Sequence, residues 1–262
     1  MKNLNILFIG DIFGNPGIEK VEEELLNLKE KYAIDFVIAQ SENVSGRKGF
    51  LKKDYDKLSI AGVDAFTLGN HVWAKKEILN IIDNKNIIRP LNIEEHYPGN
   101  GSSVFEINGT TLRVTSLMGI TFNKLLSPWK EEYANSFFDA IDKLIETDES
   151  DFHFIDFHAE TTSEKNVLAV YLDGKVDALI GTHTHVQTND AKIFEKNLAF
   201  VSDAGMTGPS NCAIGANFQE VYEKMRFDSF SRFQVSKNIS QFNGVVVQLN
   251  KKKSKIKLIN FI

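Results

Sequence analysis

Short apolar runs alternate with segments of helical periodicity along the first third of the chain. The segment 16–32 places Ile18, Val21, Leu25 and Leu28 on one helix face, and Pro16 suits a helix start. We expect strands at 4–11, 35–43, 63–71 and 86–92, and helices at 16–32, 52–62 and 75–84. This alternation predicts βαβ units, and therefore a mostly parallel sheet covered by helices.

The rest of the chain adds antiparallel elements. Asn108-Gly109 separates two alternating runs within 102–119, which is a strong hairpin signal. We expect an amphipathic helix at 128–147, strands at 152–160, 176–183 and 198–205, and an antiparallel C-terminal pair at 243–250 and 254–262. Mixed sheets of this length usually divide into two packed sheets. No linker or internal repeat interrupts the pattern, so we expect one α/β domain spanning 1–262.

Composition narrows the class of function. The chain has 262 residues, with 30 basic and 35 acidic side chains and a net charge of -5, which argues against a dedicated nucleic-acid surface. The lysine-rich run 251–255 is expected to be a solvated turn. Cys212 is the single cysteine, so an internal disulfide and a Cys-rich zinc site are excluded. Neither a signal-peptide pattern nor a run near the ~20 apolar residues of a membrane span is present, so we expect a cytoplasmic protein.

Polar side chains follow several of the predicted strands at the point where each strand ends. These strand-end residues are Asp11, the Ser41-Glu42-Asn43 triplet, Asn70 with His71, His158, and the pair His183 and His185. Ligands bind beyond the carboxyl ends of the strands in open α/β sheets, so parallel strands would bring all of these groups to one rim. Two histidines at i and i+2 also point to the same side of an extended segment. Clusters of His, Asp, Glu and Asn without thiols are typical of a divalent metal site.

The motifs GD-x-x-G, SEN, GNH, DFHAE, GTHTHVQT and SDAGMTGP occur in this order along nearly the whole chain. In this order and spacing the chain resembles the YmdB-like bacterial metallophosphoesterases, a branch of the calcineurin-like superfamily. The resemblance implies a four-layer α/β/β/α sandwich of mixed, mostly parallel sheets, with a dimetal site at the carboxyl ends of the strands. It also implies phosphodiesterase activity, with cyclic nucleotides as substrates.

The resemblance further implies the role of each strand-end residue. One divalent ion would be held by Asp11, Asn43 and His185, the other by Asn70, His158 and His183, and Glu42 would bridge the two. We expect iron or manganese, with zinc as an alternative. His71 would contact the phosphate and protonate the leaving oxygen. The wider superfamily has a histidine where this chain has Phe13, and Asn43 takes its place; the branch usually has glycine where this chain has Ser41.

Metal coordination lowers the pKa of bound water, so we expect attack on a phosphodiester by metal-bound hydroxide with His71 as general acid.

Gly69 and Gly181 suit places where backbone passes close to the site, although ordinary strand-exit turns explain them equally well. We expect the 45–49 loop either to contact phosphate or ribose or to be a solvated loop, and residues 207–209 to form part of the pocket wall. Trp73 and Phe122 could stack on a nucleobase, but we expect them to be core residues. His96 and His153 are expected to be solvent-exposed or structural.

Two other functions remain open at this point. The same dimetal centre could serve a phosphomonoesterase or nucleotidase, because substrate choice depends on the pocket walls. A non-catalytic nucleotide-sensing protein is the second alternative, although the motif retains every ligand and His71. No P-loop sequence is present, which excludes that class of nucleotide hydrolase. The expected partner is a small phosphodiester or cyclic nucleotide, and homo-oligomerisation is left open.

Overall fold

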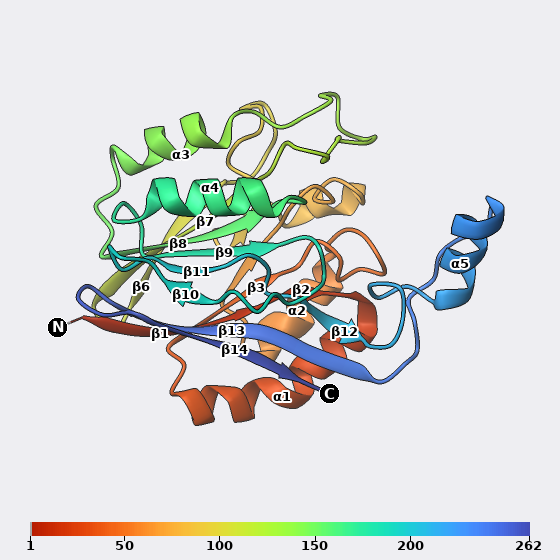
Figure 1. Cartoon of the computed structure of the whole chain (residues 1–262), viewed down its shortest axis with the longest axis horizontal. Coiled ribbons are helices and arrows are strands. Elements are labelled where there is room, and N and C mark those ends of the chain that lie inside the picture. Colours follow the sequence, from red (N-terminus) through yellow and green to blue (C-terminus); the bar gives the residue numbers. More distant parts are fainter. Residues whose placement is uncertain (1) are drawn as a thin grey trace.

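The computed structural model describes residues 2–262, which form two sheets packed face to face with helices on both outer sides (Figure 1). The eight-stranded sheet has the order β2-β12-β13-β1-β3-β4-β5, with β14 beside β13, and the six-stranded sheet has the order β10-β11-β9-β8-β7-β6. The strands of the first sheet are β1 (Asn3–Ile9), β2 (Asp11–Ile12), β3 (Phe36–Gln40), β4 (Ala65–Thr67), β5 (Ile87–Ile88), β12 (Met206–Pro209), β13 (Ser240–Asn250) and β14 (Lys255–Phe261). Those of the second are β6 (Ser102–Ile107), β7 (Thr110–Met118), β8 (Phe152–His158), β9 (Ala178–Thr182), β10 (Lys192–Ile193) and β11 (Ala199–Val201).

Three apolar layers hold the sheets and helices together. The helices are α1 (Gly14–Tyr32), α2 (Lys52–Ala61), the 3-10 helix η1 (Lys76–Asn80), α3 (Phe137–Ile145), α4 (Thr162–Leu172) and α5 (Phe218–Phe227). α1 and α2 cover the outer face of the eight-stranded sheet, and α3 and α4 cover that of the six-stranded sheet. A separate apolar cluster fills the space between the sheets. The predicted four-layer α/β/β/α sandwich is therefore confirmed.

The continuous apolar run of β1 follows from this arrangement. Ile6 and Phe8 point between the two sheets, whereas Leu7 and Ile9 point towards α1. A central strand covered on both faces needs apolar side chains at every position rather than at alternate ones. The strands β3 and β4 are buried in the same way. Because β1 pairs parallel with β3 and β3 pairs parallel with β4, the carboxyl ends of the three strands lie at the same edge of the sheet.

Several predicted elements are confirmed, and others differ in extent. The Asn108-Gly109 hairpin joins β6 and β7, with both residues at positive φ, and β13 pairs antiparallel with β14. The predicted helix at 128–147 forms only from Phe137, because the Ser136 side chain caps a new helix by accepting from the Asp139 N–H at 3.2 Å. The residues before it form turns. The predicted helix at 75–84 is largely the short 3-10 helix η1, and the strand at 86–92 shrinks to β5.

Two helices, α4 and α5, were not predicted from the sequence. α4 packs against the six-stranded sheet, whereas α5 stands apart from the sandwich at one end of the molecule (Figure 1). None of the helices within residues 2–262 has the length and apolar character needed to span a membrane.

Candidate dimetal centre

The strand-end residues meet at one rim of the sandwich, as predicted. Glu42 and Asn43 follow β3, Asn70 and His71 follow β4, and Asp11 follows β1 after one glycine. His158 ends β8 and His183 follows β9, so the second sheet supplies the opposite side of the cluster. Asp11, Glu42, Asn43 and His158 are buried almost completely. Two sheets that pack face to face thus supply one common cluster of oxygen and nitrogen atoms.

The Nε2 atom of His158 is the centre of one group of four side chains. It lies 3.1 Å from Glu42 Oε1, 3.0 Å from Asn70 Oδ1 and 3.0 Å from His183 Nδ1. A single ring nitrogen carries at most one hydrogen, so it cannot satisfy three such neighbours by hydrogen bonding. A divalent cation among these four atoms would satisfy all of them, and the mixture of imidazole and oxygen donors suits a transition metal. This group therefore fits a metal ion.

A second group forms around Asp11 on the other side of Glu42. Asn43 Nδ2 lies 3.4 Å from Asp11 Oδ1 and 3.3 Å from His185 Nε2, and His185 Nε2 lies 3.7 Å from Asp11 Oδ1. Rotating the Asn43 amide by a half turn would present its oxygen, rather than its nitrogen, to both neighbours. The group then offers the carboxylate, amide oxygen and imidazole that a second cation needs.

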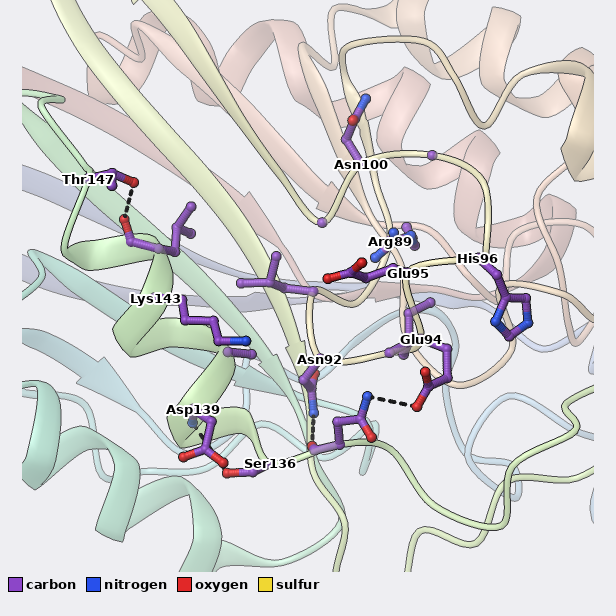
Figure 2. Close-up of a pocket in the computed structure, with 17 residues that line it drawn as sticks. Arg89, Asn92, Glu94, Glu95, His96, Asn100, Ser136, Asp139, Lys143 and Thr147 are labelled. Carbon is purple, nitrogen blue, oxygen red and sulfur yellow. Dashed lines mark hydrogen bonds between the residues drawn. The ribbon is translucent and has the colours of Figure 1, made fainter.

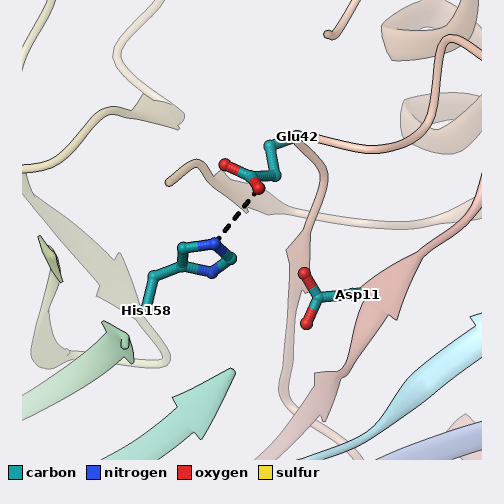
Figure 3. Close-up of side chains that lie close together, drawn as sticks. All are labelled: Asp11, Glu42 and His158. Atoms are coloured by element: carbon teal, nitrogen blue, oxygen red, sulfur yellow. Dashed lines mark ion pairs between the residues drawn. The ribbon is translucent and has the colours of Figure 1, made fainter. Parts of the chain in front are cut away.

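Glu42 joins the two groups. Ligand atoms of Asp11, Glu42 and His158 all lie within 4.8 Å of one another, and Figure 3 shows Glu42 directed at His158 with Asp11 beside them. Glu42 also contacts His71: Oε2 accepts from the His71 backbone N–H at 2.9 Å, and Oε1 lies 3.0 Å from His71 Nδ1. This central position is the one expected of a bridging carboxylate.

Burial and mutual charge set the protonation of the cluster. Burial disfavours the charged form of Glu42, but His158 and His71 outweigh it and hold the pKa of that carboxyl well below its ordinary value. Burial would likewise depress the pKa of His158, yet Glu42 and Asp11 raise it to about 9. Burial and the nearby His158 lower the pKa of His183 to about 2. The raised pKa keeps a proton on His158 at neutral pH, and a metal ion bound at Nε2 would displace that proton.

Glycine allows the backbone to pass close to these ligands. A Cβ atom on Gly69 would lie 2.2 Å from Cδ2 of the His158 ring, and one on Gly181 would lie 1.9 Å from the Ser202 carbonyl oxygen. Both are far inside van der Waals contact, so neither position tolerates a side chain. The predicted close approach of backbone to the site is observed at Gly69, whereas Gly181 lies close to the backbone of Ser202 instead.

The polar groups behind His158 were not singled out from the sequence. Its Nδ1 lies 3.1 Å from Gln40 Nε2 and 2.9 Å from Thr182 Oγ1, and Thr182 donates to Asp156 at 2.7 Å. Burial raises the pKa of Asp156 to about 7. A partner on the second ring nitrogen fixes the orientation of a metal-binding histidine, so these residues support His158 from behind.

A buried ion pair supports the other two histidines. Lys165 donates to Asp203 Oδ2 at 3.0 Å, and both side chains are almost completely buried. The same oxygen accepts from the Thr184 N–H at 3.1 Å and from its hydroxyl at 2.8 Å. Thr184 lies between His183 (φ 102°) and His185 (φ 65°), two non-glycine residues in the left-handed region. This conformation costs energy and persists where neighbouring contacts impose it, which the pair at Asp203 does.

The cluster opens into a cavity of about 630 Å³, part of whose wall comes from the segment around α5. His71 lines this cavity with about a quarter of its side chain exposed. Arg47 and Lys48 from the 45–49 loop also line it, which supports the phosphate or ribose expectation for that loop. Thr207 and Gly208 lie in β12, and Gly208 packs against Phe13 on the wall.

The remaining candidates lie elsewhere. Trp73 stacks on Tyr97 at 5.2 Å within the core, while Phe122 is exposed and lines no part of this cavity. His153 is buried between Asp148 and Thr115, as a structural histidine would be.

A larger cavity of about 910 Å³ lies between α3 and residues 89–101 and contains His96 (Figure 2). None of the predicted ligands lines it. Its buried Arg89 already donates to the carbonyl oxygens of Tyr97, Pro98 and Pro90, so this guanidinium is satisfied by backbone. The smaller cavity is therefore the candidate active site.

Comparisons with known proteins identify the family of the chain. The YmdB-like protein family matches residues 7–262. The 2',3'-cyclic-nucleotide 2'-phosphodiesterase of Bacillus subtilis (strain 168) is 40% identical over 250 residues, covering 94% of this chain and 92% of that protein. A crystal structure of a phosphatase from Mycoplasma pneumoniae has a TM-score of 0.92 and 37% identity, covering 100% of this chain and 94% of the other. A hypothetical protein from Thermus thermophilus has a TM-score of 0.91 and 33% identity, covering 98% of this chain and 99% of the other. The chain belongs to the YmdB-like protein family.

Proposed function

We propose that the chain is a dimetal phosphodiesterase that hydrolyses small phosphodiesters, with 2',3'-cyclic nucleotides as the favoured class. The observation that carries this proposal is the convergence on His158 Nε2 of three donor atoms at 3.0 to 3.1 Å, beside a second group around Asp11. The whole chain acts as one catalytic domain. The named activities of its relatives place it among hydrolases of phosphoester bonds, and the Bacillus subtilis relative supplies the nucleotide class.

The proposed ligand sets follow the two groups. Asn70, His158 and His183 hold one divalent ion, Asp11, Asn43 and His185 hold the other, and Glu42 binds both. When bound there, two such ions would lower the pKa of a bound water and stabilise negative charge on the phosphoryl oxygens. Iron or manganese suits these mixed nitrogen and oxygen donors, as does zinc.

The protein's own charges determine which substrate is attracted. Asp11 and Glu42 contribute two negative charges, whereas the asparagine and neutral histidine ligands contribute none. With two divalent cations bound, a net positive centre remains at the bottom of the cavity. That charge favours an anionic phosphodiester, and the buried position of both carboxylates keeps the attraction strong.

His71 is placed to act on the leaving group. Its Nδ1 lies 3.0 Å from Glu42 Oε1 and its backbone N–H donates to Glu42 Oε2 at 2.9 Å, so its orientation is fixed from the metal side. The other ring nitrogen is left for substrate in the cavity. In the imidazolium form this nitrogen carries a proton that it can donate to the departing alkoxide oxygen, and histidine is the side chain that most often acts as a general acid near neutral pH.

The test is hydrolysis of bis(4-nitrophenyl) phosphate and 4-nitrophenyl phosphate by manganese-loaded protein. We expect turnover of the diester by the wild-type chain and its loss in Glu42→Gln, with His96→Gln as a matched control outside the site. Turnover in Glu42→Gln equal to that of the wild type would contradict the proposal. Faster hydrolysis of the monoester would instead favour a phosphomonoesterase, the alternative that the name of the Mycoplasma pneumoniae relative supports.

A further inference from the structure

The residues that line the candidate active-site cavity fall into two groups of unlike chemistry. One half of the lining carries the strand-end residues Glu42, Asn43, His71, His183 and His185. The other half is apolar and comprises Ile214, Val221, Met225 and Phe233, while the ring of Phe13 lies edge-on to His185 with the centroids 5.5 Å apart. A ligand that fits both halves needs an anionic group at one end and an apolar surface at the other.

The apolar half belongs to a segment that is anchored to the strand-end residues themselves. This segment, residues 213–236, is called the α5 arm here. His185 Nδ1 lies 3.1 Å from the Ile214 carbonyl oxygen. Gly215 packs against the ring of Phe13 so closely that a Cβ atom would lie 2.4 Å from it. The two ends of the arm join where the Ser236 N–H donates to the Gly215 carbonyl at 2.9 Å. The position of the arm relative to the proposed metal ions is therefore set by direct contacts.

Apolar side chains of the arm are open to solvent although they line the cavity. Met225 is 83% exposed and Ile214 is 57% exposed. Leaving this much apolar surface in water is unfavourable, and covering it with a bound molecule would recover about 25 cal/mol for each Å² buried. The exposed apolar wall is thus suited to an apolar part of a ligand.

Arg47 adds a hydrogen-bond donor to the same half. Its guanidinium lies over the Phe233 ring at 5.3 Å from the centroid, so it reaches from the 45–49 loop to the arm. Across residues 2–262, no carboxylate forms an ion pair with Arg47. The loop itself is held by Ser45, which donates to the buried Asp54 at 2.5 Å. A positioned guanidinium without an acidic partner is available to a ligand.

We propose that the apolar half of the cavity is the nucleoside subsite, in which the base packs against Val221, Met225 and Phe233 and Arg47 donates to its acceptor atoms. This inference rests on the proposed function and adds how the substrate is selected. With the phosphodiester at the strand-end residues, the organic group points towards the arm. A flat base suits an aromatic and thioether wall, whose contacts do not depend on base identity.

The experiment compares a 2',3'-cyclic nucleotide with its base-free analogue, methyl ribofuranoside 2,3-cyclic phosphate, on the manganese-loaded chain. We expect Met225→Ala and Phe233→Ala to raise KM for the nucleotide by about 5-fold to 100-fold, the range that stacking and contact energies imply. We expect KM for the base-free analogue to stay within about twofold of wild type, and kcat to change little for either substrate. Phe230→Ala is the matched control, because Phe230 is 98% exposed on the same arm and does not line the cavity.

The outcomes separate the inference from the function on which it rests. Equal losses on both substrates, or no loss on either, would overturn the nucleoside subsite while leaving phosphodiesterase activity in place. Absence of turnover of both substrates by the wild-type chain would overturn the proposed function, and the subsite with it. Met225 is mostly exposed, so Met225→Ala keeps the test valid even where Phe233→Ala disturbs the arm.

Discussion

His183 Nδ1 lies 3.0 Å from His158 Nε2, so two imidazoles from neighbouring strand ends meet edge to face within one of the two groups of the candidate dimetal centre. The two nitrogens can share one hydrogen at most, and His158 Nε2 also lies close to the oxygens of Glu42 and Asn70. A cation bound between the rings would interact with both nitrogens and both oxygens at once. Metal binding at this pair should therefore exchange the proton on His158 for a metal ion.

Each of the two groups of ligands should bind one metal ion independently of the other. Removing the imidazole in His183→Ala should release the ion near His158, and His185→Ala should release the ion near Asp11. We expect each variant to retain about one metal ion per chain after dialysis, against two for the wild type. Metal analysis by mass spectrometry measures this directly, with His96→Ala as the control that keeps both ions. Identical content in all variants would mean that these histidines are not ligands.

Metal affinity should depend on pH through His158. Its pKa is raised to about 9, above the ordinary value of 6.5, so the metal-free cluster holds a proton there at neutral pH. Because the metal must displace that proton, we expect apparent affinity to rise with pH, by at most about tenfold per unit, and to level off near pH 9. Titration calorimetry in buffers of different ionisation enthalpy counts the released proton.

The raised pKa of His158 should also make the stability of the metal-free protein depend on pH. A group whose pKa is raised on folding contributes stability that is present below its unfolded value and is lost as pH rises through its folded value. Metal-free protein should therefore lose stability between about pH 6.5 and pH 9, the window set by His158. Metal-loaded protein should not show this loss, because no proton remains on the ring. Denaturant titrations at several pH values measure the unfolding free energy of both forms. The same pH dependence in the metal-free and the metal-loaded protein would contradict the proton-for-metal exchange.

Gly69→Ala should disturb His158 without changing any ligand. The new methyl group would lie 2.2 Å from the His158 ring, which must move away from Glu42 and Asn70. We expect loss of the metal ion near His158 and a drop in phosphodiesterase turnover of at least about 100-fold, as a misplaced catalytic group typically costs. Gly109→Ala is the control: it strains the β6–β7 hairpin at φ 73°, far from the cavity, and should keep its metal content.

The sequence could predict that the strand-end residues lie together because the relevant signals are local. Each strand ends in its own polar group, and parallel strands bring these ends together in any doubly covered sheet. The groups that support the ligands carry no such signal. Lys165 lies in a helix that periodicity missed, and its importance comes from contact with Asp203, 38 positions away. Gln40 and Asp156 look like ordinary residues of buried strands until the sheets are packed.

The predicted helix at 128–147 is wrong in its first part for a related reason. Apolar spacing continues through Trp129 and Tyr133, but Trp129 donates its Nε1 hydrogen to the Asn70 carbonyl at 2.8 Å. This contact draws the segment towards the strand end that carries Asn70, and the helix begins only at its Ser136 cap. Tertiary contacts override local propensity in such a case.

Asp148 should stabilise the fold through His153 and Arg113. Its Oδ1 forms an ion pair with Arg113 Nε at 2.8 Å, and its Oδ2 lies 3.1 Å from His153 Nδ1. Although burial opposes it, hydrogen bonds from His153 and Arg113 hold the pKa of Asp148 well below its ordinary value of 3.8. A depressed carboxylate pKa gives stability that is present above pH 3.8 and lost as pH falls through the folded value. Asp148→Asn should lower the free energy of unfolding by about 2 to 3 kcal/mol at pH 7.

The difference in unfolding free energy between Asp148→Asn and the wild type should become smaller at acidic pH. Below about pH 3.8 the wild-type carboxylate begins to lose this advantage, so the two unfolding free energies should converge. Asp83→Asn, at an exposed position without an ion pair in residues 2–262, is the control and should change little. A difference that does not depend on pH would assign the effect to packing rather than charge.

The Lys165–Asp203 pair should position His183 and His185 through Thr184. Lys165→Met leaves a buried carboxylate without its cation, which costs about 3 to 5 kcal/mol of unfolding free energy. We also expect weaker metal binding, because Asp203 then no longer holds Thr184 rigidly. The double variant Lys165→Met/Asp203→Asn removes the unpaired charge but keeps an acceptor for Thr184, so stability and metal affinity should recover in part. Lys175→Met, which breaks a half-exposed 3.8 Å pair with Asp142, should cost less than about 1 kcal/mol and leave metal affinity unchanged. Unchanged metal affinity in Lys165→Met, measured by calorimetry where the variant is fully folded, would show that the pair supports the fold alone.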